Sequence, residues 1–183
     1  MNLYFVCKEG EFVRVLGIDP GYAIVGFGIV DYESNHFKVI NYGAVTTPAG
    51  MEFSRRLQNI YNDLTDLILK YRPDALSIEK LFFNTNSTTA IDVAQARGVV
   101  LLAAANNNVP IYEYTPLQIK QAVTGYGRAE KKQVMEMVRQ LLNLKAVPKP
   151  DDTADALAIA ICHAHTGGSV YSKLSQIVNG GKL

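Results

Sequence analysis

The stretch "VRVLGIDPG" at residues 13–21 is a compact apolar run that ends in an acid, a proline and a glycine. A run of this kind before a tight turn predicts a β-strand over 13–19. Two further β-rich runs follow, "AIVGFGIVDY" at 23–32 and "FKVINYGAVTT" at 37–47, separated by the polar turn Glu33-Ser34-Asn35. Three consecutive strands at this spacing predict an antiparallel meander.

Helical and strand patterns alternate beyond the meander. Apolar residues at helical spacing predict helices over 54–71 and 88–106, and short strands are predicted at "ALSIEK" (75–80) and "VPIYEY" (109–114). Pro116 opens a third helix, 131–142 is an amphipathic fourth, and a Pro148/Pro150 linker leads into an acidic helix. A meander joined to βαβ crossovers predicts an α/β fold, with a mixed five-stranded sheet flanked by helices.

Length and composition predict a single domain. The chain has 183 residues, of which 48% are hydrophobic and 19% charged, an ordinary globular mix. We expect a core over about 13–165, an N-terminal extension over 1–12 and a C-terminal tail over 166–183. The longest apolar runs, such as 99–105, are far too short for a membrane span, and Glu9, Glu11 and Arg14 interrupt any signal peptide.

The two cysteines, Cys7 and Cys162, form neither a disulfide framework nor a zinc pattern. Together with the absence of an apolar leader, this predicts a soluble, cytoplasmic protein that does not associate with membranes.

Carboxylates stand at the ends of two predicted strands, Asp19 in "LGID" and Glu79 in "LSIE". Neighbouring strand ends in such a sheet open onto a crevice that commonly binds ligands. A buried carboxylate without a partner is costly, so each needs a cation or a hydrogen-bond network. Taken alone, Asp-Pro-Gly is usually only a turn.

The acidic helix starts with Asp151, Asp152 and Asp155. Asp151 and Asp152 both share a helix face with Asp155, so helix geometry does not choose between them. Acids in a first turn are also explained by the helix dipole alone. If this helix start meets the two strand ends, however, four carboxylates converge, and such a cluster suits Mg²⁺ or Mn²⁺. Two such ions about 3.5–4 Å apart are a standard device for phosphodiester hydrolysis.

Positive charge is concentrated in one segment. Residues 120–145 hold six bases and two acids, a balance of +4 in a chain whose net charge is +1. The remainder is therefore −3. This asymmetry indicates an anionic ligand, although a solvated helix face would give the same pattern.

Five motifs together resemble one known family. "LGIDPG", "IEKLFFNTN", "AQARGVV", "EYTPLQIKQAVTGYGRAEK" and "PDDTADALAIAICH" occur in the order and spacing of the RuvC family of Holliday junction resolvases, over about 13–165. The resemblance implies an RNase H-like fold and a homodimer with two Mg²⁺ ions per subunit, for which Mn²⁺ would substitute. It also implies paired symmetric nicks in four-way junction DNA during recombination and repair, with a branch-migration motor complex as partner.

The resemblance assigns the catalytic and metal-binding acids to Asp19, Glu79, Asp152 and Asp155, and leaves Asp151 as a capping residue. The resemblance also implies that Phe82 lies at the junction centre and that Lys120 and Lys131 lie near the cleaved strand. We expect Arg128, in the same basic loop, to contact phosphate as well.

Phe82 and His163 can also be explained as structural residues. Phe82 would otherwise be read as a core residue, and Phe83 beside it leaves open which of the two is exposed. His163, roughly 16 Å along the helix from Asp152, is too far away to share its metal ions, so we interpret it as structural.

Three other functions fit part of the pattern. Another RNase H-like nuclease, acting on RNA or single-stranded DNA, would share the acids but not the basic loop. An actin-like or sugar-kinase ATPase would need a second lobe and more Gly-rich phosphate loops than this chain has. A non-catalytic DNA-binding module would be opposed by four acids facing a polyanion.

Overall fold

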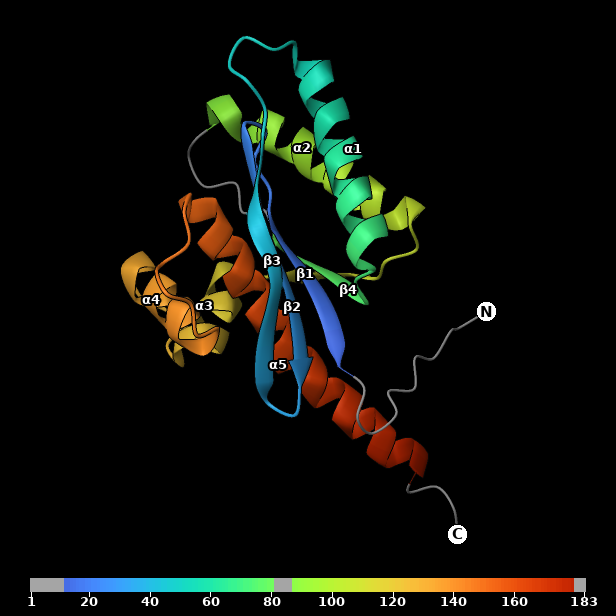
Figure 1. Ribbon diagram of the computed structural model, residues 1–183, viewed down its shortest axis with the longest axis vertical. Helices are drawn as coiled ribbons and strands as arrows, with labels where there is room; N and C mark the ends of the chain where they lie inside the picture. Colours follow the sequence, from blue (N-terminus) through green and yellow to red (C-terminus); the bar gives the residue numbers. More distant parts are fainter. Residues whose placement is uncertain (1–11, 81–86, 180–183) are drawn as a thin grey trace.

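Five strands form one mixed sheet at the centre of the molecule (Figure 1). The computed structural model describes residues 12–80 and 87–179. The strands are β1 (Val13–Asp19), β2 (Ile24–Glu33), β3 (His36–Thr46), β4 (Ala75–Glu79) and β5 (Ile111–Tyr114), in the order β3-β2-β1-β4-β5. The pairs β1–β2 and β2–β3 are antiparallel, whereas β1–β4 and β4–β5 are parallel. The predicted meander and mixed sheet are therefore confirmed.

The β2–β3 connection explains why the meander turns where it does. Glu33 pairs with His36, which leaves Ser34 and Asn35 as a two-residue loop. Both loop residues have positive φ, 47° and 66°. Positive φ at both central positions is the geometry of a type I′ turn, whose twist matches that of the strands it joins.

Helices cover both faces of the sheet (Figure 1). Helices α1 (Phe53–Tyr71) and α2 (Ser87–Asn106) pack on one face with the apolar side chains of Leu16 and Ile18. Helices α3 (Pro116–Thr124), α4 (Lys131–Leu141) and α5 (Asp151–Asn179) pack on the other, where Val15 lies. Alternate residues of β1 thus face opposite layers, as the two-residue period of a strand requires.

The predicted elements are present, with ends that differ by one or two residues. Helix α5 continues to Asn179, through most of the segment 166–183 that is predicted to be a C-terminal tail. Across residues 12–80 and 87–179, no helix is both long and apolar enough to cross a membrane.

Candidate active site

Two of the predicted site acids end neighbouring strands. Asp19 is the last residue of β1 and Glu79 is the last residue of β4. These strands run in parallel with Ile18 beside Ile78, so the two acids lie next to each other at the same end of the sheet. The parallel crossover through α1 is what brings together residues 60 positions apart in the sequence.

Glycines in β1 and β2 allow the start of α5 to pack closely at this same end of the sheet. Gly26 of β2 pairs with Asp19, and residues opposite one another in an antiparallel pair point to the same face. A Cβ added to Gly26 would lie 2.0 Å from the carbonyl oxygen of Asp152, and one added to Gly17 would lie 2.1 Å from that of Ala156. Only a strand surface without side chains lets the helix backbone approach so closely. Sequence reasoning missed the role of both glycines, Gly17 in "VLGID" and Gly26 in "GFG".

Electrostatics show that the four acids interact. The pKa of Asp19 is raised to about 7, first by burial and then by the nearby carboxylates of Asp155, Asp152 and Glu79. The pKa of Glu79 is also raised by burial and by Asp155, while Lys120 opposes the shift. The cluster therefore has an excess of negative charge at neutral pH, which a proton or a cation would relieve.

Asp151 and Asp152 have different surroundings. The carboxylate of Asp151 accepts a hydrogen bond of 2.7 Å from the ammonium of Lys149 and lies 3.7 Å from that of Lys131. These lysines hold the pKa of Asp151 below its usual value, with Lys149 the main cause. Asp152 instead has its backbone against Gly26 and its carboxylate within the field of Asp19. Asp151 thus faces lysines, whereas Asp152 faces the strand ends.

Lys131 is a cation in direct contact with the cluster. Its Nζ donates a 2.9 Å hydrogen bond to Oδ2 of Asp155, and this contact raises the pKa of Lys131. Asp19 and Asp151 also contribute to that rise. The first residue of α4 therefore partly neutralises the first turn of α5.

The donor chemistry of the cluster fits a hard divalent cation, because Mg²⁺ and Mn²⁺ prefer carboxylate oxygens. Within the described ranges, however, no three Asp, Glu, His or Cys side chains are grouped so that they could hold a metal ion. Asp155 is bound to Lys131 instead. Metal binding here would require the carboxylates to close around the ion.

Two of the four predicted DNA-contact residues lie near the clustered acids. Lys120 of α3 and Lys131 of α4 lie close enough to influence Glu79 and Asp19, respectively. Arg128 is exposed in the α3–α4 connection and forms no ion pair with any described residue. Phe82, like Phe83, lies outside the described residues.

His163 is a buried residue of α5, with 1% of its surface exposed. Its Nδ1 is 2.7 Å from the hydroxyl of Tyr114, and its ring packs 4.3 Å from the ring of Tyr112. Burial lowers the pKa of His163 to about 4, so the ring is neutral at physiological pH. These surroundings are those of a structural histidine.

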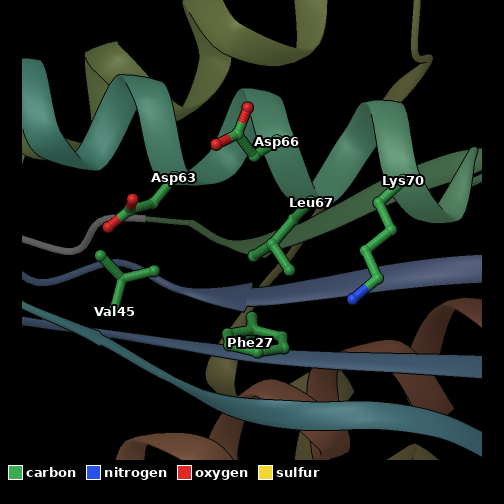
Figure 2. A pocket seen from close by; sticks show the side chains of 6 residues that line it. All are labelled: Phe27, Val45, Asp63, Asp66, Leu67 and Lys70. Atoms are coloured by element: carbon green, nitrogen blue, oxygen red, sulfur yellow. The ribbon is translucent and has the colours of Figure 1, made fainter.

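A hollow of about 300 Å³ lies on the opposite face of the sheet (Figure 2). Phe27 and Val45 reach into it from the strands, and Asp63, Leu67 and Lys70 line it from α1, together with Asp66. Phe27 follows Gly26 in β2 and therefore points away from α5. This hollow is separate from the four acids.

Comparison with known proteins identifies close relatives. A family model described as "Crossover junction endodeoxyribonuclease RuvC" matches residues 15–163. The enzyme of that name from Alkaliphilus oremlandii is 62% identical over 153 residues, which cover 84% of this chain and 93% of that protein. The one from Clostridioides difficile is 61% identical over 152 residues, covering 83% and 90%.

Solved structures agree with the sequence matches. RuvC from Thermus thermophilus is 36% identical and superposes with a TM-score of 0.81, covering 87% of this chain and 98% of that one. The same protein in complex with a Holliday junction substrate gives a TM-score of 0.82, with 87% and 97% covered. The predicted RNase H-like fold is confirmed by these matches.

Proposed function

The chain belongs to the RuvC family of crossover junction endodeoxyribonucleases, and on that premise we propose that its four clustered acids carry out metal-assisted cleavage of four-way DNA junctions. As a member of this family it is a Holliday junction resolvase, a hydrolase that acts on DNA in recombination and repair. The proposal concerns which of its residues perform the reaction and with which ions.

We assign catalysis and metal binding to Asp19, Glu79, Asp152 and Asp155, with two Mg²⁺ ions per subunit and Mn²⁺ as a substitute. When bound, such ions activate a water molecule and stabilise the oxygen that leaves the phosphorus. The protein's own part is to hold the carboxylates of two strand ends close to those of the start of α5, which packs against β2 at Gly26. The single observation that carries the proposal is that these acids converge at one end of the sheet, where burial, and then the carboxylates of the other three, raise the pKa of Asp19 to about 7.

The surroundings of the two adjacent aspartates support Asp152 over Asp151. Asp152 acts on the pKa of Asp19, whereas Asp151 is paired with Lys149 and Lys131. Asp151 then stabilises the start of α5 through ion pairs with Lys149, two residues before it, and with Lys131 of α4. This choice agrees with the D-x-x-D pattern that Asp152 forms with Asp155.

Basic residues around the acids would bind the DNA. We assign the phosphates closest to the cut to Lys131, whose ammonium lies 2.9 Å from Asp155, and to Lys120, whose charge acts on Glu79. We assign Arg128 to a phosphate farther away, and Phe82 to the junction centre. Phosphate contacts of this kind fix the position of the strand without reading its sequence.

We also propose that the chain acts in the cytoplasm as a homodimer, together with a branch-migration motor complex. A four-way junction has two-fold symmetry, and paired nicks need two active sites related by the same symmetry. Helix α2 exposes Ile91 (68%) and Leu102 (52%), which is apolar surface that this subunit does not cover. This surface is a suitable dimer contact.

Cleavage of a synthetic mobile four-way junction tests the proposal. The substrate is compared with linear duplex, flap and RNA–DNA hybrid controls, each with and without Mg²⁺. We expect paired nicks in the junction only, and only with the metal. Preferential cleavage of the hybrid or of single strands would instead favour a different RNase H-like nuclease, and metal-independent nicking would contradict the role of the four acids.

A further inference from the structure

Tyr126 is an exposed aromatic residue in the connection between α3 and α4. Its side chain is 61% exposed. The loop around it is fixed by hydrogen bonds: the Tyr126 N–H donates to Oγ1 of Thr124 at 3.1 Å, and the Gly127 N–H donates to Oε1 of Gln121 at 3.0 Å. Gly125 adopts φ 75°, which favours glycine, to make the turn. An ordered loop therefore presents an aromatic ring to solvent.

A hollow of about 480 Å³ lies beside this ring. It is lined by Tyr126, Lys132 and Glu136, with Thr124, Ala129, Gln133 and Met137 completing the wall. Glu136 is paired with Arg139 at 2.6 Å, whereas Lys132 forms no ion pair with any residue in the described part of the chain. The hollow thus combines an aromatic face with an unmatched positive charge, which suits an anionic ligand that carries a flat ring.

The first turn of α4 connects this hollow to the acids. Lys131 contacts Asp155, and Lys132 follows it directly. Successive helix residues point about 100° apart, so the two ammonium groups emerge from one turn toward different surfaces. A polyanion that lies along this turn would meet Lys131 at the acid cluster and then Lys132 in the hollow.

We propose that this hollow binds the junction strand next to the cleaved phosphate, with Tyr126 stacked on a base and Lys132 in contact with the adjoining phosphate. The inference rests on the proposed function, because it takes the four acids as the place of cleavage. It adds two DNA-binding residues to that site. Single-stranded or unpaired bases gain about 1–3 kcal/mol from stacking on an aromatic side chain.

Junction binding without divalent metal tests this inference, using Tyr126→Ala, Tyr126→Phe and Lys132→Gln. Tyr126→Ala should weaken binding roughly 5- to 150-fold with an unchanged salt slope, and Tyr126→Phe should bind like the wild type. Lys132→Gln should lower the salt slope by about one unit. Tyr42→Ala and Lys38→Gln, at exposed positions on strand β3, are the matched controls and should have no effect.

Melting curves verify that each variant is folded, and Lys132→Gln tests the hollow even if Tyr126→Ala is unstable. Wild-type affinity and salt slope in both Tyr126→Ala and Lys132→Gln would overturn the inference and leave a protein partner as the occupant of the hollow. A wild-type protein that binds junctions but never cleaves them would refute the proposed function instead, and the binding measurements would still decide the role of the hollow.

Discussion

Replacing Gly26 by alanine should separate the acids without removing any of them. The new Cβ would lie 2.0 Å from the carbonyl oxygen of Asp152, whereas ordinary contact begins near 3.4 Å. The strand or the helix start must therefore move by about 1.4 Å. Because the obstacle is helix backbone, it cannot rotate away as the end of a side chain could.

This displacement is large on the scale of catalysis. A misplacement of about 1 Å typically costs on the order of 100-fold in rate, so we expect at least that loss of junction cleavage. Overpacking should also destabilise the fold by about 1–3 kcal/mol, which for a chain of this size lowers the melting temperature by roughly 2–12 °C. Alanine is otherwise favoured over glycine in a strand by about 0.5–1 kcal/mol. A net loss of stability would therefore be caused by the contact with Asp152.

Gly28→Ala is the matched control in the same strand and on the same face. Its Cβ would meet Cδ2 of Leu157 at 2.6 Å, a side-chain atom that lies beyond the acids along α5. Both variants are assayed by single-turnover junction cleavage and by thermal melting. Gly28→Ala should lose stability but keep most of its activity. Wild-type cleavage by Gly26→Ala would refute the claim that this close contact holds the acids together.

Three further predictions follow from the charges and the exposed surface. Asp19→Asn should raise the melting temperature of the metal-free protein at pH 8 by roughly 3–10 °C. The folded-state pKa of Asp19 is about 7, so ionisation of this carboxyl lowers the free energy of unfolding as pH rises from about 4 to 7. An unchanged melting temperature at pH 8 would contradict this. His163 has the opposite pH dependence. Because its folded-state pKa is about 4, the free energy of unfolding should fall by up to about 3 kcal/mol as pH falls from 6.5 to 4. Urea titrations of His163→Gln should lack this fall. Leu102→Glu should produce a monomer by light scattering, and a wild-type monomer at micromolar concentration would contradict the proposed dimer.

The ends of strands β1 and β4 could be predicted because the local pattern is strong, whereas the role of the acids at these ends was assigned by the resemblance to a family. Apolar runs that end in Asp19 and Glu79 mark both the strands and their final residues, and the parallel crossover then fixes their meeting. The position of the acidic helix is different, because it depends on Gly17 and Gly26. A glycine in a strand does not reveal which distant backbone will fill the space above it.

The roles of Asp151 and Asp152 could not be derived from helical spacing either. Both lie on a face shared with Asp155. Their surroundings differ because Asp151 pairs with Lys149 and Lys131, whereas Asp152 lies against Gly26 and acts on Asp19. Lys149 is local in sequence, but Lys131 comes from another helix. The resemblance to a family supplied the choice before geometry could support it.

The central claim is that Asp19, Glu79, Asp152 and Asp155 form the catalytic centre, and it is tested most directly by comparing Asp152→Asn with Asp151→Asn. The measurement is single-turnover cleavage of a four-way junction in Mg²⁺, alongside junction binding without metal. We predict that Asp152→Asn abolishes cleavage while binding is kept or improved, because repulsion of the DNA is reduced, and that Asp151→Asn still cleaves. Normal cleavage by Asp152→Asn with an inactive Asp151→Asn would contradict the assignment.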